Sequence, residues 1–359
     1  MGFRYIGSKN NIVQLILSKI KSLSSPGAHI TDLMCGTATI SQSLKENGYK
    51  VTAVDVMTYS FHHACVKLLL NKTPTFKGCE NIIKNHNIRD DELFAKTPYE
   101  EIIQYLNELK PIKGYFFREF SPDGKPANST KSRKYFTSYN AQSIDAIRKE
   151  IFRLKENTYI SEIEHSLLLH DLIMAGNDIA NIAGTYGHYL SKFAGRALDN
   201  LCLKPTVILP SNNNKDHKVI KGYAEEVSGQ INCDLCYIDP PYMKRQYAAN
   251  YHILETLARE DEPEAIGVSG LRPWRDQYSN FCSKLKIRNA FDKIFTNMNS
   301  DLFLISYSEE GLLKRDELFD LFSNYGNVEV DTFDNKRFKS HNRKSANYIE
   351  EYLFTLYKK

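Results

Sequence analysis

The group with the clearest chemical meaning is Asp239-Pro240-Pro241-Tyr242, directly after the apolar run 235–238. Two prolines remove backbone donors and stiffen the turn, so the Asp239 carboxylate and the Pro240 carbonyl present two hydrogen-bond acceptors in a fixed geometry. Two acceptors suit an amino group such as the exocyclic amine of a base, and the Tyr242 ring offers a stacking face. The pattern predicts a site that orients an amine; the alternative is a plain Asp-Pro-Pro turn.

A second group, DLMCGTATIS at 32–41, is predicted to be a strand end that turns at Gly36 into a helix. A glycine turn lets a ligand approach the backbone closely. The group has one glycine where a pyrophosphate loop has three, so a dinucleotide is disfavoured. Asp55 lies 19 residues after Gly36, at the end of the next predicted strand, where a carboxylate can bind ribose hydroxyls. A nucleoside without phosphates therefore fits better, with a capping aspartate as the structural alternative.

The elements that must position these groups alternate between strands and helices, a pattern typical of an α/β fold with a parallel sheet. Apolar periodicity predicts strands at 30–34, 51–54, 235–238, 302–306, 328–332 and 352–356. It predicts helices at 11–23, 39–46, 140–155, 161–183, 280–298 and 312–323. The alternation is lost after about residue 70. We therefore expect one domain formed by 1–71 and 216–359, with an inserted domain at 72–215.

Positive charge is concentrated in two segments, although the net charge is only +4. Segment 110–155 has eleven Lys or Arg against four Asp or Glu, interleaved with eight Tyr or Phe. Segment 335–349 has no acidic residue and carries Lys336, Arg337, Lys339, Arg343 and Lys344. Both segments are typical of surfaces that face phosphates. The alternative is a solvated basic face.

Length and composition exclude several classes of protein. The 359 residues suggest about two domains, and 42% hydrophobic with 12% aromatic residues exclude a disordered chain. No apolar stretch approaches a membrane span, and no signal peptide is apparent. The seven scattered cysteines suit reduced thiols, so we expect a cytoplasmic protein that does not bind a membrane.

Metal binding is not predicted. Cys233 and Cys236 have the spacing of a zinc half-site, but no second pair follows, and core thiols fit better. His62, His63 and His252 are expected to be packed or surface residues rather than ligands. The chain also lacks GxSxG, Walker-type and HExxH motifs, so hydrolase and NTPase functions have no motif to support them.

Taken together, the motifs resemble those of the Dam-like, alpha-group adenine-specific DNA methyltransferases of type II restriction-modification systems. The resemblance rests on FRYIGSK at 3–9, the Gly36 turn, Asp55 and IDPPY, in that order. RQYAANYHILETLAR at 245–259 and ISYSEEGLL at 305–313 add to it. It implies an α/β, Rossmann-like S-adenosylmethionine-dependent methyltransferase sheet with an inserted, mainly helical target-recognition domain.

The resemblance also implies roles for residues of the cofactor site. Tyr5 and Lys9 would help to bind S-adenosylmethionine, Asp32 and Gly36 would line its methionine end, and Asp55 would hold its ribose. Two positions depart from the usual pattern, because Cys35 replaces Phe or Ala, and Ala38 stands where a second glycine is common. Glu225 is a loose match to an acidic position near the cofactor adenine.

At the target base, the resemblance implies that Asp239, Pro240, Pro241 and Tyr242 hold the adenine, with Asp239 also beside the cofactor. Met243 follows, where the family often has Asn. The expected reaction is methyl transfer to the exocyclic amine of an adenine flipped out of duplex DNA. Such modification would protect host DNA from a restriction endonuclease that acts on the same site without direct contact.

Double-stranded DNA is the expected partner. Predicted DNA contacts are Arg133, Lys134, Tyr186 in GTYGHYL (184–190), Lys336, Arg337 and Lys339. Two alternatives stay open: an amino methyltransferase that acts on RNA or a protein amide, and a sequence-specific DNA-binding regulator without catalysis.

Overall fold

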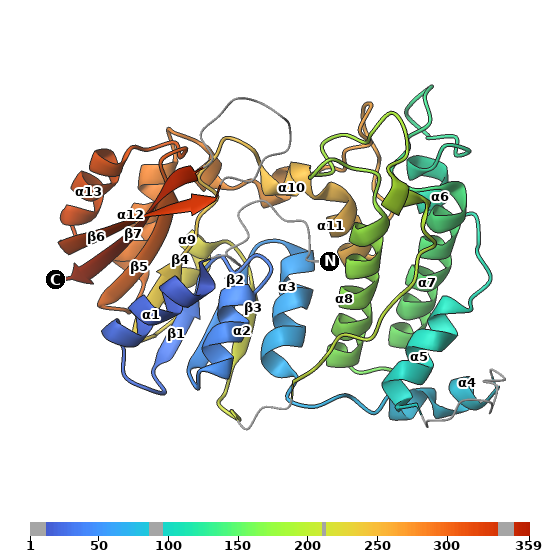
Figure 1. The fold of residues 1–359 in the computed structure, drawn as a ribbon, viewed down its shortest axis with the longest axis horizontal. Coiled ribbons are helices and arrows are strands. Elements are labelled where there is room, and N and C mark those ends of the chain that lie inside the picture. The colour runs from blue at the N-terminus through green and yellow to red at the C-terminus, as the bar shows by residue number, and fades with distance from the viewer. Residues whose placement is uncertain (1–11, 86–95, 210–212, 337–347) are drawn as a thin grey trace. The chain divides into compact units, whose positions relative to one another are not determined.

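The computed structural model describes residues 12–85, 96–209, 213–336 and 348–359, and the chain divides into two compact units (Figure 1). The sheet unit comprises Gly7–Leu69, Ser211–Ala248 and Gln277–Lys359. Among the described residues, the helical unit lies within Leu70–Pro210 and Ala249–Asp276. Residues 249–276, which were expected to belong with the sheet, therefore group with the predicted insertion.

The sheet unit is built on seven strands in the order β3-β2-β1-β4-β5-β7-β6. The strands are β1 His29–Asp32, β2 Lys50–Asp55, β3 Lys218–Lys221, β4 Leu235–Ile238, β5 Leu302–Ser308, β6 Gly326–Lys336 and β7 Tyr348–Lys358. Neighbours from β3 to β5 pair in parallel, and β7 is antiparallel to both β5 and β6. The predicted α/β, Rossmann-like sheet is confirmed. Strand order reverses between β1 and β4, and ligands bind at such a point in open α/β sheets.

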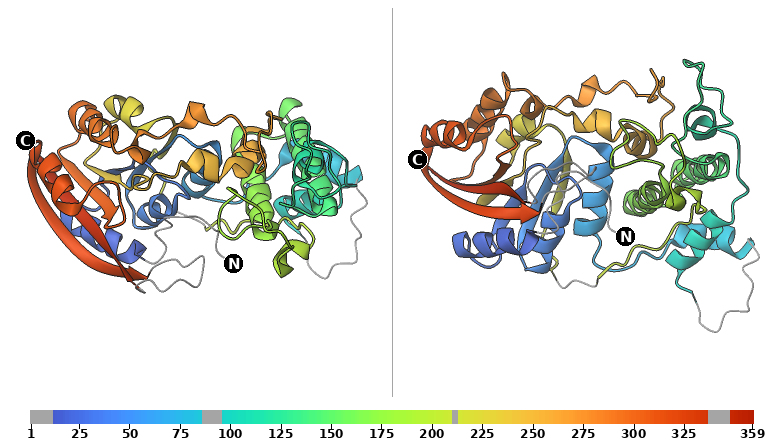
Figure 2. Two further views of the ribbon diagram at one scale, coloured as in Figure 1. Left: turned by 90° about the horizontal axis from the view of Figure 1, so that it is seen from above. Right: turned by 45° about the horizontal axis from the view of Figure 1, so that its top comes forward.

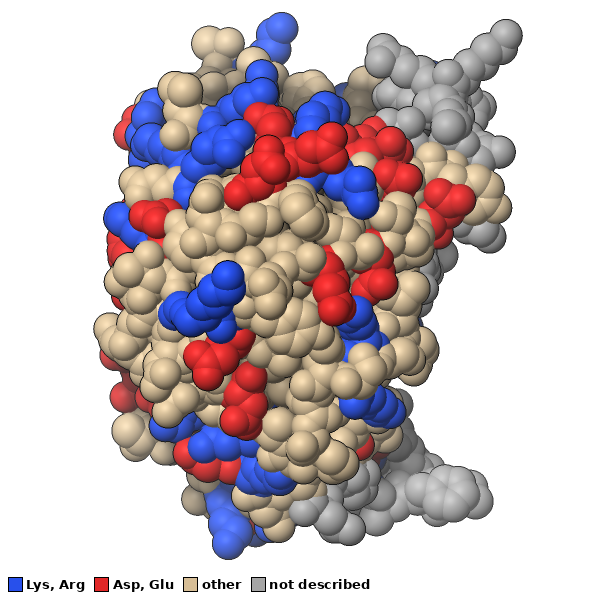
Figure 3. All heavy atoms as spheres, turned by 90° about the vertical axis from the view of Figure 1, so that its left-hand side faces the viewer, with Lys and Arg blue, Asp and Glu red and all other residues tan. Residues whose placement is uncertain are grey.

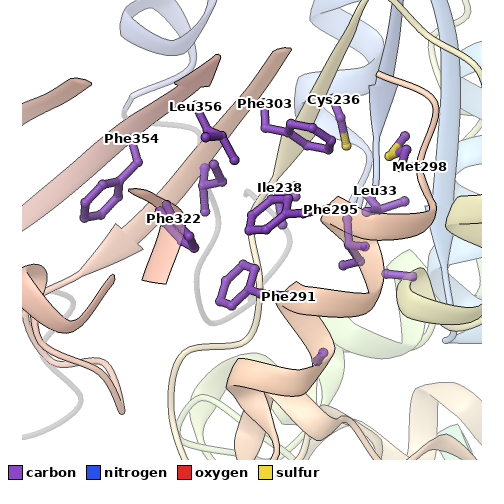
Figure 4. Close-up of a cluster of buried hydrophobic side chains, with 14 of the residues drawn as sticks. Leu33, Cys236, Ile238, Phe291, Phe295, Met298, Phe303, Phe322, Phe354 and Leu356 are labelled. Atoms are coloured by element: carbon purple, nitrogen blue, oxygen red, sulfur yellow. The ribbon is translucent and has the colours of Figure 1, made fainter. Parts of the chain in front are cut away.

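Helices cover both faces of this sheet (Figure 2). They are α1 Val13–Leu23, α2 Thr39–Glu46, α3 Thr58–Ala64, α9 Ala224–Val227, α12 Ile287–Asn297 and α13 Arg315–Ser323. Leu235 and Tyr237 of β4 pack in the cluster with α1 and α2, whereas Cys236 and Ile238 pack with α12 and α13 (Figure 4). This alternation follows from the two-residue period of a strand buried on both faces.

Most element predictions agree with the structure, and the clearest miss is β3. Helix α2 has the predicted bounds, and β6 and β7 each extend several residues beyond theirs. Strand β3 is a four-residue edge strand with exposed Lys218 and Lys221 at its ends and only half-buried residues between them. It therefore lacks the apolar run by which the other strands were predicted.

The helical unit contains α4 Glu80–Asn85, α5 Pro98–Asn107, α6 Tyr115–Phe120, α7 Ser138–Glu156, α8 Glu162–Ile179 and α11 His252–Arg259. The short α10 (Tyr247–Asn250) lies at the sequence boundary between the units. α7 packs against α8 and is joined to it by five residues, so the start of α7 and the end of α8 lie at the same end of the unit (Figure 1). No helix among the described residues is long and apolar enough to cross a membrane.

Aromatic residues of the basic segment 110–155 form part of the core of the helical unit. Five of them are buried and stack edge-on or tilted with ring centroids 5.5–6.3 Å apart, namely Tyr115, Phe116, Phe120, Tyr135 and Phe136. The expectation that aromatic side chains are interleaved with cations on a surface is wrong for these five residues, because their rings are buried in the core.

The side of the sheet unit at β6 carries both signs of charge (Figure 3). On β6, Glu329 and Asp331 lie 3.8 Å and 2.7 Å from the Lys19 ammonium of α1. Of the second predicted basic cluster, Arg337, Lys339, Arg343 and Lys344 lie outside the described residues, as does the side chain of Lys336. Its predicted role at phosphates therefore stays a prediction.

Candidate active site

Three carboxylates lie at the carboxyl ends of neighbouring strands. Asp32 ends β1, Asp55 ends β2 and Asp239 follows β4. Strand β1 pairs with both β2 and β4, with Asp32 opposite Ala53 and Tyr237. The fold thus brings the two motifs, separated by some two hundred residues of sequence, to the point where the strand order reverses.

Asp55 holds the turn after β1 in place. Its Oδ2 accepts a hydrogen bond of 2.8 Å from the Gly36 amide, and its Oδ1 accepts one of 2.8 Å from the Met57 amide. Gly36 has φ +52°, a value that glycine adopts without strain, and Ala38 adopts φ +54° without that freedom. The Asp55 carboxylate therefore fixes the position of the turn between β1 and α2. The bonds to the turn were not predicted from the sequence.

Lys67 is a second support of this turn that the sequence did not reveal. It belongs to the π-helix Cys65–Leu69 (η1), and its Nζ donates to the Thr37 carbonyl at 2.7 Å. Burial lowers the pKa of Lys67 to about 8. The available signal was a lysine inside the apolar run CVKLLL at 65–70, since a cation there needs a specific acceptor.

Asp32 is buried beneath the turn, and its Oδ2 accepts a hydrogen bond of 2.6 Å from the Ser41 hydroxyl. Burial raises the pKa of Asp32 to about 7, and the negative charges of Asp239 and Asp55 add to the rise. The three acids are therefore close enough to repel one another. A site with this charge favours a ligand that carries positive charge.

The raised pKa of Asp32 predicts that its contribution to stability falls as pH increases. The unfolded chain loses this proton near pH 4 and the folded protein near pH 7, so between them the folded state binds more protons and stability drops by up to about 1.4 kcal/mol per pH unit. We expect Asp32→Asn to lack this loss. Urea unfolding at pH 5 and pH 8, followed by circular dichroism, measures the difference between variant and wild type.

A matched control is Asp234→Asn, an exposed carboxylate just before β4, whose Oδ2 accepts the His29 amide at 2.7 Å. We expect this variant to keep the wild-type pH dependence. If Asp32→Asn keeps it too, Asp32 does not titrate in this range.

The Asp-Pro-Pro-Tyr turn is held by Tyr307 of β5 and by the loop that follows this strand. The Tyr242 ring packs at 57° against buried Tyr307, with ring centroids 5.7 Å apart. The Leu312 amide donates to the Tyr242 carbonyl at 2.9 Å, and the Leu313 amide donates to the Tyr307 hydroxyl at 3.3 Å. Tyr242 is therefore held on its ring and on its backbone.

Gly311 leaves space for the Tyr307 ring. A Cβ at position 311 would lie 2.0 Å from Tyr307 Cε1. Tyr307 and Gly311 both lie in ISYSEEGLL, where sequence analysis assigned them no role. Both residues affect the position of the Tyr242 ring, through a contact that is visible only in the folded structure.

The chain after the turn is tied to the segment before α12. The Gln246 side chain donates to the Ser279 carbonyl at 3.0 Å and accepts from the Ser279 amide at 2.8 Å.

Met243 is exposed. Glu225, in α9, is buried and accepts a hydrogen bond of 2.8 Å from Asn280 Nδ2. Its role beside a cofactor adenine stays a prediction.

Two of the predicted DNA contacts are inside the helical unit. Arg133 is fully buried and lies 2.9 Å from the Glu119 carboxylate. Tyr186 is also fully buried, and its hydroxyl donates to Asn177 Oδ1 at 3.1 Å. Both side chains are engaged within the core, so the prediction that they contact DNA at the surface is wrong.

Lys134, another predicted DNA contact, is half-exposed. Tyr5 and Lys9 lie outside the described residues.

The other candidate ligands are packed residues. Cys233 and Cys236 are buried in the core of the sheet unit, where burial raises the pKa of both thiols. His252 is buried in the helical unit, its Nε2 donates to the Tyr186 carbonyl at 3.0 Å, and burial lowers its pKa to about 3. Within the described residues, no three His, Cys, Asp or Glu side chains are grouped to hold a metal.

Comparison with known proteins identifies the family to which this chain is similar. The model of the D12 class N6 adenine-specific DNA methyltransferases matches residues 5–321. The type II methyltransferase M.FokI of Planomicrobium okeanokoites is 34% identical, over 99% of this chain and 52% of that protein. The modification methylase LlaI of Lactococcus lactis subsp. lactis is 32% identical, over 94% of this chain and 52% of that protein.

A third relative is matched along nearly its whole length. The type II methyltransferase M.CviAII of Paramecium bursaria Chlorella virus 1 is 32% identical, over 98% of each chain. The chain therefore spans about half the length of M.FokI and LlaI, and nearly all of M.CviAII.

Proposed function

Because this chain belongs to the D12 class of N6 adenine-specific DNA methyltransferases, we propose that it methylates the exocyclic amine of adenine at a specific sequence in duplex DNA. The methyl donor is S-adenosylmethionine, and the modification protects cytoplasmic host DNA from a restriction endonuclease that cuts the same site. The observation that supports this best is the meeting of the Asp32–Ala38 turn, Asp55 and the Asp239 turn at the strand-order reversal.

The residues present fit S-adenosylmethionine. The cofactor supplies an electrophilic methyl group on a positively charged sulfur. We propose that Asp32 and the backbone at Gly36 receive its charged methionine end, where three carboxylates repel one another in the free protein. Asp55, at the end of β2 beside the Gly36 turn, accepts from the ribose hydroxyls. Tyr5 and Lys9 are proposed as further contacts.

At the target base, Asp239 and the Pro240 carbonyl accept the two hydrogen bonds of the amine. An amine conjugated to a base is a poor nucleophile, so acceptors on its protons increase electron density at nitrogen and aim its lone pair. Tyr242 stacks on the base, which must first leave the helix at a cost of a few kcal/mol. Catalysis is then mainly positioning plus hydrogen bonding.

The bracing of Tyr242 predicts that Gly311→Ala impairs catalysis. The added Cβ cannot fit 2.0 Å from Tyr307 Cε1, so the Tyr307 ring and the Tyr242 ring on it must shift. We expect kcat/KM with duplex DNA to fall by roughly 10²-fold, the size of effect that a 1 Å misplacement produces. Steady-state kinetics with DNA and cofactor varied separately measures it.

Gly229→Ala is the matched control, because a Cβ there makes only an ordinary 3.6 Å contact with the Asn297 Cβ. Its kcat/KM should stay near wild type. Full activity of Gly311→Ala would show that the position of Tyr307 does not matter for Tyr242.

The helical unit is proposed to be the target-recognition domain. Lys134, Lys336, Arg337 and Lys339 are proposed as phosphate contacts, which position a protein on DNA without reading sequence. Arg133 and Tyr186 are not part of this proposal, because both are buried.

The proposed function is tested by competition between methyl acceptors. Equal masses of duplex DNA, RNA and protein are offered together with labelled S-adenosylmethionine, and the label in each fraction is counted. We expect label in duplex DNA. Label in RNA or protein would keep the cofactor site and replace the substrate. Cofactor binding without label in any acceptor would favour the DNA-binding regulator.

A further inference from the structure

Arg133 holds one loop of the helical unit in shape. Its guanidinium donates to the carbonyls of Gly267 at 2.8 Å, Val268 at 3.2 Å and Ala265 at 3.3 Å. The Glu119 carboxylate, 2.9 Å away, balances its charge. A buried cation with this many backbone acceptors fixes the path of the chain, so residues 265–270, here called the Arg133 loop, are well ordered by it.

The backbone of the Arg133 loop is also constrained locally. Ile266 and Leu271 exchange two amide-to-carbonyl hydrogen bonds of 2.9 Å and 2.8 Å. Gly267 and Gly270 have φ +69° and +66°, and a Cβ on Gly270 would lie 2.8 Å from Arg133 Nε. The loop is thus a tight turn closed over the guanidinium.

Two aliphatic side chains are exposed on this ordered loop. Ile266 is 52% exposed and Val268 is 58% exposed. Apolar side chains at single surface positions are common. Here two of them lie on one loop, whose backbone the buried Arg133 holds in place, and this suggests a contact surface.

Cationic residues lie in the two segments, 131–134 and 187–192, to which the loop is hydrogen-bonded. Ser269 Oγ donates to the Gly187 carbonyl at 2.7 Å, which ties the loop to GTYGHYL beside exposed His188. Lys134 directly follows Arg133, and its Nζ donates to the Ser191 carbonyl at 3.3 Å. Lys131 and Lys192 are exposed in the same segments. Two exposed acids, Glu262 and Glu264, precede the loop. Glu262 pairs with Arg148, and Glu264 accepts from Asn128 Nδ2 at 2.9 Å.

We propose that the Arg133 loop contacts the target DNA, with Ile266 and Val268 against apolar parts of the bases and Lys134 at a phosphate. Aliphatic groups distinguish thymine by its methyl group, and lysines neutralise phosphates. Two aliphatic side chains on a loop that is bonded to lysine-containing segments therefore fit duplex DNA better than an apolar protein face. The inference rests on the proposed function and names residues of the recognition surface.

The test compares the double variant Ile266→Ser/Val268→Ser with Lys134→Ala. The probe is duplex DNA amplified from unmethylated genomic template, and DNA affinity is measured at several salt concentrations with S-adenosylhomocysteine present. We expect the double variant to bind at least tenfold more weakly with an unchanged slope of log affinity against log salt. Lys134→Ala should bind more weakly and lower that slope by about one.

Leu285→Ser is the matched control, since Leu285 is an aliphatic residue that is 94% exposed in the sheet unit, outside the candidate site. All variants should bind cofactor like wild type. DNA binding by the double variant equal to that of Leu285→Ser would overturn this inference while leaving the methyltransferase function intact. A wild-type protein that methylates no DNA would instead overturn the proposed function itself.

Discussion

Asp239→Ala is expected to lose methyl transfer by on the order of 10³-fold or more, the loss seen when a group that acts in the transition state is removed. In the proposed mechanism, loss of the carboxylate leaves the target amine only the Pro240 carbonyl as acceptor, so that its lone pair is no longer oriented. S-adenosylmethionine should still bind nearly as well, because Asp32, Gly36 and Asp55 remain. Single-turnover kinetics and calorimetric titration with the cofactor separate the two effects.

Two further variants sharpen this prediction. Asp239→Asn keeps one acceptor oxygen in the same place and should fall between wild type and alanine. Asp234→Asn, just before the same strand, should behave like wild type. Turnover by Asp239→Ala equal to wild type would remove Asp239 from the proposed mechanism, and a loss confined to cofactor affinity would restrict it to the cofactor site.

Arg133→Met is expected to destabilise the helical unit by about 3–5 kcal/mol, because it removes the buried one of the two arginines that pair with the buried Glu119 carboxylate. Glu119 keeps Arg118 Nε at 2.9 Å and the Ala127 amide at 3.1 Å, which places the effect toward the lower end of that range. Trp274 is the single tryptophan and belongs to this unit. Its fluorescence during urea unfolding therefore reports on the unit selectively.

Lys134→Met is the control, one residue away and half-exposed, and should change the free energy of unfolding by no more than about 0.5 kcal/mol. If Arg133→Met is as stable as this control, the burial of Arg133 is not important for the fold, and a role at the surface would have to be reconsidered.

The sheet and the carboxylate cluster were predictable because their signals are local. The apolar runs 51–54 and 235–238 end directly before Asp55 and Asp239, and parallel strands share one carboxyl edge. The predicted strand 30–34 extends two residues beyond the observed end of β1 at Asp32. β3 was missed because an edge strand with exposed lysines at both ends shows no such run.

Contacts between distant segments could not be predicted in the same way. Composition shows that segment 110–155 is rich in cations and aromatic residues, but it does not show whether Arg133 faces a phosphate or Glu119. That choice depends on residues 265–268, more than a hundred positions away. The ring contact between Tyr307 and Tyr242 likewise joins segments far apart in the sequence.

The central claim is that adenine in duplex DNA is the methyl acceptor. The most direct measurement incubates the protein with isotopically labelled S-adenosylmethionine and unmethylated genomic DNA, then locates modified bases at single-base resolution. We predict labelled N6-methyladenine in one recurring sequence. Modified cytosine in place of adenine, or DNA without label while another acceptor is methylated, would contradict the claim.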